Sequence, residues 1–176
     1  MKYAQIRDLD VSNGVGIGVA LFVQGCHFHC KNCFNSNTWN FDGGKEWTTE
    51  MEEEFIISAE RPYIKRISIL GGEPLCDENV SDVLKLIKKI RERLPDKTIW
   101  IYTGYSWDEI FSDKHEQKHG ANSDRASAVS LCDILVDGRY IDEQRDMALK
   151  WRGSRNQRVV DVKSSLNNIK LELFCD

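Results

Sequence analysis

Three cysteines fall within eight residues of this chain, shortly after an apolar run of strand length. The run extends from Val19 to Val23, and the cysteines are Cys26, Cys30 and Cys33. Thiolates are soft ligands that bind zinc or iron–sulfur clusters. A structural zinc site closes with four ligands, and a cubane 4Fe-4S cluster also needs four. The fold must therefore present a three-ligand loop at the end of a strand, with a fourth position left for another ligand.

Histidines could complete a zinc site, but their positions do not favour this. His27 and His29 each lie between two cysteine ligands on a tight loop, where zinc coordination would be strained. His115 and His119 have the i, i+4 spacing of a helical metal pair. They fall within residues 112–126, which hold almost no apolar residue. We expect a mobile surface loop or frayed helix there, with both imidazoles solvated.

The remaining cysteines, Cys76, Cys132 and Cys175, are scattered along the chain. Disulfides are rare in intracellular proteins, so we expect no disulfide framework. Isolated free cysteines most often behave as small buried hydrophobic residues. This is the interpretation for Cys76 and Cys132, and no specific role is expected for Cys175.

Predicted strands alternate with predicted helices along the chain. Helices are expected at about 49–59, where a capping box precedes a stripe of Met51, Phe55 and Ala59, at 80–94, and after the capping box at 106–109. The chain has strand-like runs at 19–23, 65–70, 98–102, 134–136, 159–162 and 169–174. This alternation predicts an α/β fold with a mostly parallel sheet covered by helices.

Glycine follows four of the predicted strands. In parallel α/β folds the carboxyl ends of strands line the ligand site, and glycine allows backbone to approach a ligand closely. Glycine could also simply make each turn, but four such ends, one of them followed by three thiols, favour a shared pocket. The four segments are Gln24-Gly25-Cys26, Gly71-Gly72-Glu73, Thr103-Gly104 and Asp137-Gly138.

Length and charge narrow the class of protein. The chain has 176 residues, which suits one domain and is too short for an eight-unit barrel of about 250 residues. Its net charge of −4 gives no electrostatic reason to bind nucleic acid or an anionic membrane. No stretch reaches the roughly 18–20 apolar residues of a membrane span, and the first residues lack a signal-peptide core. We expect a cytoplasmic location.

The spacing Cys-x3-Cys-x2-Cys is that of the radical S-adenosylmethionine (SAM) enzymes. The chain resembles, over nearly its whole length, the family of organic radical-activating enzymes that act on anaerobic ribonucleoside-triphosphate reductase. The Trp-Arg-Gly-Ser and Asn-Gln segment narrows the resemblance to this family. The residues that carry it are 10–14 with Gly16, 21–35 with Thr38-Trp39, 71–75, 100–105, 135–138, 151–154 and Asn156-Gln157.

The resemblance implies a fold and a set of ligands. The fold would be a partial (β/α)6 TIM-like barrel of the radical SAM type, with residues 1–176 as a single radical SAM domain. It implies that the three clustered cysteines hold a 4Fe-4S cluster and that SAM fills the fourth iron position. The implied SAM contacts are Gly71, Gly72, Glu73 and Pro74 at the methionine amino group, Asn32, Cys33 and Phe34 at the adenosine end, and Thr103 with Gly104 less directly.

One position departs from the superfamily pattern. Many members carry an aromatic residue immediately before the third cysteine. In this chain Asn32 stands there, and the aromatic residue follows the cysteine as Phe34. This departure affects the prediction of which residue contacts the adenine.

The resemblance also implies an activity. Reductive cleavage of SAM would give a 5′-deoxyadenosyl radical, which removes a hydrogen atom from a glycine on the large subunit of the reductase and leaves a glycyl radical. A flavodoxin-like protein would donate the electron, and no side chain is expected to act as general acid or base. Two alternatives stay open: a radical SAM enzyme for another target, and a zinc- or cluster-stabilised interaction module without catalysis.

A basic segment lies near the end of this acidic chain. It either contacts the reductase or forms an ordinary solvated face. Trp151 lies within it and is expected to be a core residue more than an interface anchor. The basic residues are Arg139, Arg145, Lys150, Arg152, Arg155 and Arg158.

Overall fold

A computed structural model describes residues 1–111, 121–168 and 170–175. The expectations for His115, His119 and the polar loop at 112–120 lie outside these residues. Helix α4 (Ala121–Ser130) covers the whole remainder of the expected loop, residues 121–126. None of the described helices is long and apolar enough to cross a lipid bilayer.

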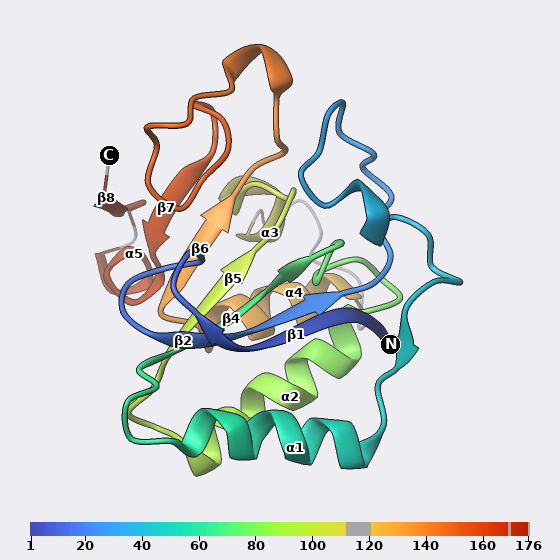
Figure 1. Cartoon of the computed structure of the whole chain (residues 1–176). Helices are drawn as coiled ribbons and strands as arrows, with labels where there is room; N and C mark the ends of the chain where they lie inside the picture. Colours follow the sequence, from blue (N-terminus) through green and yellow to red (C-terminus); the bar gives the residue numbers. More distant parts are fainter. Residues whose placement is uncertain (112–120, 169, 176) are drawn as a thin grey trace.

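Eight strands form one sheet in the order β3-β1-β2-β4-β5-β6-β7-β8 (Figure 1). The strands β2 (Gly18–Val23), β4 (Arg66–Gly71), β5 (Thr98–Tyr102) and β6 (Ile134–Asp137) form its parallel centre. The flanking strands are β1 (Lys2–Asp10), β3 (Lys45–Glu46), β7 (Arg158–Asp161) and β8 (Leu173–Cys175), and their pairings are antiparallel.

The prediction of six βα units therefore holds only for the four central strands, and the described sheet is mixed. Parallel neighbours need a long crossover, usually a helix, whereas a short connection forces an antiparallel pair. Residues 11–17 are too few for a crossover, so β1 and β2 form a hairpin. The connection from β6 to β7, residues 138–157, is long enough for a crossover but contains a 3-10 turn, η3 (Asp142–Gln144), and no helix that could cover the sheet, and β7 pairs antiparallel with β6.

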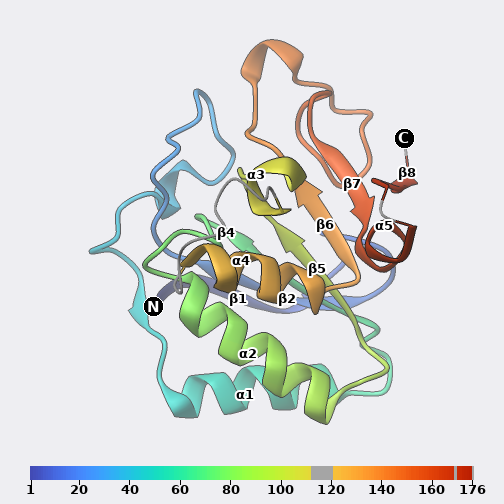
Figure 2. The same ribbon diagram turned by 180° about the vertical axis from the view of Figure 1, so that it is seen from behind.

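The crossover helices cover one face of the sheet. They are α1 (Thr49–Glu60), α2 (Val80–Arg93), α3 (Trp107–Phe111) and α4; Figures 1 and 2 show α1 and α2 below the strands, and Figure 2 shows α4 in front of them. Both predicted capping boxes precede helices. Thr48, one residue earlier than expected, caps α1, whereas Ser106 and Glu109 exchange hydrogen bonds as predicted. A short helix, α5 (Val162–Asn168), occupies most of the gap between β7 and β8.

Each central strand presents alternate residues to two different environments. Val19, Leu21 and Val23 of β2 belong to the core beneath the helices, as do alternate residues of β4, β5 and β6. Their neighbours Ala20 and Phe22 face the opposite, inner side of the sheet. Because side chains alternate along a strand, the continuous apolar runs supply both the core and the inner surface.

Buried polar groups close the lower part of the inner surface. Arg66 is fully buried and donates from Nη2 to Oδ2 of Asp10 at 2.8 Å. Burial alone would raise the pKa of Asp10, but hydrogen bonds from Arg66 and Asn13 hold this pKa below its usual value. Ser68 Oγ donates to the carbonyl of Asn13 at 2.7 Å. These contacts draw the β1–β2 turn against the sheet, so the inner hollow opens toward the carboxyl ends of the strands.

Candidate cluster-binding site

A cavity of about 690 Å³ lies over the inner face and the carboxyl ends of the central strands. Two segments form its opposing walls. We call residues 24–41 the cysteine loop and residues 138–157 the arm; Figure 1 shows both rising above the sheet. The strand ends at Gly71–Glu73 and Thr103–Gly104 form the floor. The four glycine-terminated strand ends thus contribute to one hollow, as the sequence predicted.

All three clustered cysteines, Cys26, Cys30 and Cys33, line this cavity. The cysteine loop folds back on itself, because Gly25 N donates to the carbonyl of Thr38 at 2.7 Å and Cys26 N to that of Trp39 at 3.1 Å. Left-handed backbone at His29 and Asn32, with φ of 46° and 56°, winds the chain between the cysteines. The thiols consequently face one space from a single short loop.

The donor set fits an iron–sulfur cluster. Burial raises the pKa of the Cys26 thiol to about 11 and also raises that of Cys30, although backbone N–H groups partly offset the effect. Bound iron would favour the thiolates and release their protons. Among the described residues, no three His, Cys, Asp or Glu side chains converge on one metal ion. A cubane needs no such convergence, since each of its cysteines binds a different iron.

The two histidines of the cysteine loop contact other side chains outside the cavity lining. His27 Nε2 lies 2.7 Å from Oε1 of Glu78, and the imidazole of His29 stacks on Trp39 with ring centroids 4.7 Å apart. Neither histidine lines the cavity. The zinc alternative that used His27 or His29 therefore gains no support from their placement.

Close backbone contact joins the cysteine loop to the end of β4. Glu73 N donates to the carbonyl of Gly25 at 2.7 Å, and Gly72 N donates to that of Val23 at 2.9 Å. A Cβ at Gly72 would lie 2.3 Å from the Gly25 oxygen. Gly71 has a φ of 107°, which favours glycine. This Gly-Gly pair allows the cysteine loop and β4 to meet at the cavity floor.

Glu73 acts as a bridge between two strand ends. Its carboxylate accepts hydrogen bonds from Leu75 N, Thr103 Oγ1 and Gly104 N at 2.7–2.8 Å. Burial raises the pKa of Glu73 to about 7 despite these bonds. Pro74 is buried beside it and lies outside the cavity lining. Of the predicted contacts here, the structure brings Gly71, Gly72, Glu73, Thr103 and Gly104 to the cavity, and Pro74 supports them from behind.

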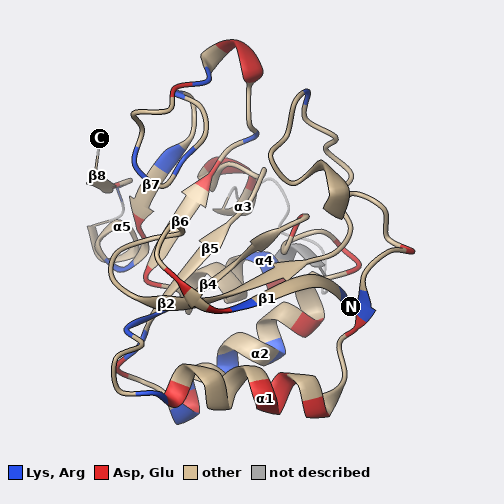
Figure 3. Cartoon of the chain, viewed as in Figure 1, with Lys and Arg blue, Asp and Glu red and all other residues tan. Residues whose placement is uncertain are grey.

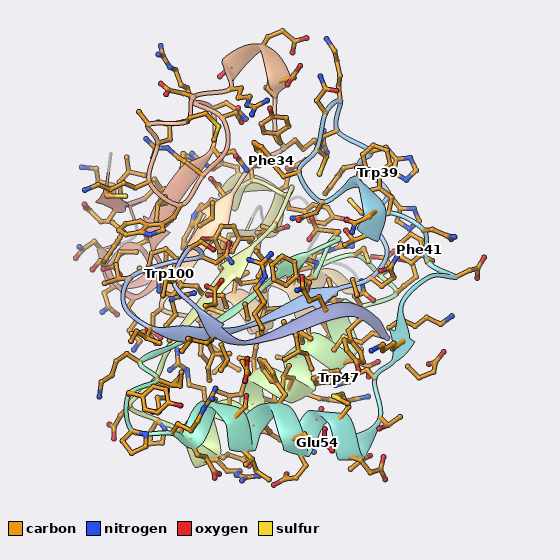
Figure 4. The ribbon with its side chains drawn as sticks, in the orientation of Figure 1. Phe34, Trp39, Phe41, Trp47, Glu54 and Trp100 are labelled. Atoms are coloured by element: carbon orange, nitrogen blue, oxygen red, sulfur yellow. The ribbon has the colours of Figure 1, made fainter. Side chains whose placement is uncertain are left out.

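The expected adenosine contacts also include residues that line the cavity and one that does not. Phe34 lines the cavity and is 57% exposed; Figure 4 shows it between the cysteine loop and the arm. Asn32 is exposed and lies outside the lining, and its Nδ2 donates to Asp142 Oδ2 at 2.7 Å. The left-handed backbone at this position suits asparagine better than a bulky residue. The departure from the aromatic pattern thus has a local conformational reason.

The arm supplies wall residues that had no assigned role in the sequence analysis. Gln157 Oε1 accepts hydrogen bonds from Gly153 N at 2.9 Å and Ser154 N at 3.1 Å, and its Nε2 donates to the carbonyl of Gly138 at 3.0 Å. Tyr140 lies 5.3 Å from Phe34, centroid to centroid. The Trp-Arg-Gly-Ser and Asn-Gln motif was the signal for this wall, but the motif alone did not indicate that it closes a cavity.

Most residues of the basic segment identified in the sequence are engaged within the chain. Arg139 pairs with Glu109 at 3.3 Å, Arg155 with Asp146 at 3.0 Å, and Arg158 with Asp137. Figure 3 shows acidic and basic positions interspersed along this segment. Trp151 is half-buried, packs on the core residue Trp100 with ring centroids 5.2 Å apart and also lines the cavity, so the prediction of a core residue holds in part. Cys76 and Cys132 are buried and free, also as predicted.

Comparison with known proteins agrees with this arrangement. The family described as "4Fe-4S single cluster domain" matches residues 12–160. The anaerobic ribonucleoside-triphosphate reductase-activating protein of Escherichia coli (strain K12) is 40% identical over 161 residues, which cover 90% of this chain and 97% of that protein. The protein of the same name from Vibrio cholerae is 39% identical over 159 residues, which cover 89% of this chain and 96% of that protein.

A viral relative matches the same share of this chain. The anaerobic ribonucleoside-triphosphate reductase-activating protein of Enterobacteria phage T4 is 32% identical over 161 residues, which cover 90% of this chain and 93% of that protein. The resemblance drawn from the motifs is thereby confirmed. The chain belongs to the family of anaerobic ribonucleoside-triphosphate reductase-activating proteins.

Proposed function

We propose that this protein is a radical SAM activase that generates a glycyl radical on the large subunit of anaerobic ribonucleoside-triphosphate reductase. The observation that carries the proposal is that three cysteine thiols and the glycine backbones of three strand ends line one cavity. The names of the relatives supply the target. The mixed sheet, with the arm across its open side, would serve as the partial barrel of this single domain.

The cysteine loop would bind the cluster. Cys26, Cys30 and Cys33 would each ligate one iron of a 4Fe-4S cluster, so the fourth iron stays available to SAM. The N–H of Asn35 lies 3.4 Å from Cys33 Sγ, and backbone N–H groups of Phe28 and His29 hydrogen-bond Cys26. Such donors stabilise thiolate ligands and influence the reduction potential of the cluster.

The floor and the loop would orient SAM. Gly71 and Gly72 present backbone without side chains, which suits the methionine amino group. Glu73 would act mainly by fixing Thr103 and Gly104 beside them, because its carboxylate already accepts three hydrogen bonds. Phe34 would lie against the adenosine end. Asn32 and Pro74 would shape the loop and the floor without facing the cofactor.

The chemistry supplied by the bound groups is one-electron reduction of SAM, which releases methionine and gives a 5′-deoxyadenosyl radical able to remove a hydrogen atom from a glycine Cα. The chain itself would bind, orient and exclude water. No side chain is needed as a general acid or base. The electron would come from a flavodoxin-like donor.

Anaerobic reconstitution tests the proposal. We expect about four irons per chain, cleavage of SAM under dithionite, and a glycyl radical signal in electron paramagnetic resonance after mixing with the reductase. Stoichiometric zinc with no SAM cleavage would refute it. SAM cleavage with no radical on the reductase would indicate an enzyme for another target.

A further inference from the structure

One arginine of the arm differs from every other arginine in the chain. Arg152 lines the cavity, and within the described residues it has no ion pair, hydrogen bond or ring contact. The other arginines each contact a carboxylate, a carbonyl, a sulfur or an aromatic ring. These contacts include those of Arg7, Arg61, Arg66, Arg91, Arg93, Arg125, Arg139, Arg145, Arg155 and Arg158.

Other unpaired donors share the same cavity. Four buried side-chain atoms in the described structure lack a hydrogen-bond partner, and three belong to cavity-lining residues: Trp39 Nε1, Tyr102 Oη and Arg152 Nε. Buried donors are nearly always paired in folded proteins. Three such atoms in residues that line one cavity show that the polar groups around this hollow are incompletely paired within the described chain.

Arg152 is also held in place by the residues on either side of it. Trp151 has a left-handed φ of 59° and packs against Trp100 and Phe174. On the other side, Gly153 is fixed by Gln157, and its Cβ position lies 3.0 Å from the ring of Phe34. Strained, non-glycine left-handed backbone persists where the surrounding structure imposes it, often at functional sites. The guanidinium is therefore presented by a rigid turn.

The position of Arg152 separates it from the proposed cofactor contacts. Those contacts follow β2, β4 and β5, whereas Arg152 comes from the connection between β6 and β7. It stands between Trp151, packed on the inner face, and Gly153, packed on Phe34. The neighbouring Met147 is 76% exposed and also lines the cavity. This wall thus runs from the solvent into the cavity, as a route for an entering polypeptide would.

We propose that Arg152 binds the peptide segment of the reductase that enters the cavity, through a carboxylate or backbone carbonyl of that segment. The inference rests on the proposed function, since it concerns the substrate of the same site. A guanidinium recognises planar oxygen acceptors through several fixed donors.

The test compares Arg152→Gln and Arg152→Lys with a matched control, Arg155→Gln. Arg155 is 72% exposed, pairs with Asp146 and does not line the cavity. Affinity for the purified reductase would be measured by anaerobic calorimetry with reconstituted protein and SAM. We expect Arg152→Gln to raise Kd about tenfold or more and to reduce its dependence on salt. Arg152→Lys should recover part of the affinity, and Arg155→Gln should stay within about twofold.

A second measurement separates the peptide from the cofactor. SAM affinity and dithionite-driven SAM cleavage are measured without the reductase, where Arg152→Gln should match the wild type. Loss of SAM affinity in this variant would overturn the inference, because the carboxylate bound by Arg152 would then belong to SAM. An unchanged Kd for the reductase would overturn it as well.

Folding and the proposed function are checked independently. Thermal unfolding should be the same for the wild type and both Arg152 variants. If Arg152→Gln is unstable, the affinity of Arg152→Lys decides the test, because an ammonium group lacks the several fixed donors of a guanidinium and must still weaken binding. A wild-type protein that fails to cleave SAM would refute the proposed function. The affinity comparison would still report whether Arg152 contacts the reductase.

Discussion

The cysteine loop and the arm face the same cavity but are held in different ways. Backbone hydrogen bonds at Gly25 and Cys26, together with close contact at Gly72, fix the loop. The arm is held largely by side-chain amides, above all Gln157, and by the packing of Trp151. Spacing along the chain is therefore enough to gather the thiols, whereas the opposite wall depends on side-chain contacts between residues far apart in the sequence.

Exposed contacts connect the two walls at the mouth. Lys31 Nζ lies 2.9 Å from Glu143 Oε1, and the guanidinium of Arg145 lies 5.2 Å from the ring centre of Phe34. These contacts are solvent-accessible and individually weak. The comparison separates a cluster-binding wall fixed by backbone contacts from a second wall fixed by side-chain contacts.

The largest expected effect comes from removing one of the three cysteine ligands. Cys30→Ala should abolish cluster assembly and SAM cleavage while the sheet stays folded, because the loop projects from a strand end. Iron content and far-ultraviolet circular dichroism measure the two properties.

Cys132→Ala is the matched control for that substitution. Cys132 is fully buried in the helical layer, and its Sγ donates to the Ala128 carbonyl. The variant should keep its iron and lose only some stability. Loss of the cluster in Cys132→Ala would show that the ligand assignment is wrong.

Adding one methyl group at the cavity floor and one on the arm tests this comparison. Gly72→Ala places a Cβ 2.3 Å from a backbone oxygen, whereas Gly153→Ala places one 3.0 Å from the ring of Phe34, a side chain that can move. We expect Gly72→Ala to lower the free energy of unfolding by about 3 kcal/mol and Gly153→Ala by less than about 1 kcal/mol. Urea denaturation of both variants measures the difference; equal losses would contradict the closer backbone packing of the floor.

Loosening the arm should affect the partner more than the cluster. Gln157→Ala leaves the N–H groups of Gly153 and Ser154 without their acceptor, which should cost about 1–2 kcal/mol. We expect normal iron content and SAM cleavage but a reduced yield of glycyl radical on the reductase. If iron content falls in parallel, the two walls are not independent.

The smallest effect is expected at the mouth. Lys31→Ala removes an ion pair whose side chains are 70% and 68% exposed, so the midpoint of thermal unfolding should not change measurably. A clear decrease would mean that the contact between the two walls stabilises the fold.

Much of the fold could be predicted from local patterns. Helix α2 and strand β5 follow directly from their apolar periodicity, and the Ser106–Glu109 capping box lies where the sequence places it. Strand β1 was missed because polar and charged residues fill most of it, and its partner β3 has only two residues. The alternation of elements does not reveal the antiparallel pairings at the edges, where a short turn joins β1 to β2 and no crossover helix lies between β6 and β7.

The sequence predicted which segments form the candidate site better than it predicted where individual side chains point. Cys26, Cys30, Cys33 and the glycine-terminated strand ends line one cavity, because parallel strands must end at the same edge of the sheet. Asn32 and Pro74 belong to the correct segments but face away, since backbone torsion and burial decide where a side chain points. No pattern indicated that Arg152 would lack a partner.

The sequence by itself determined that three thiols share one loop at the end of a buried strand, and that glycines follow the neighbouring strands. Both are properties of spacing, which the chain carries in any conformation. Only the tertiary structure decided that Glu73 joins two strand ends and that the arm closes the opposite wall. Those arrangements depend on contacts between residues that are distant in the chain, and such contacts exist only after the sheet has formed.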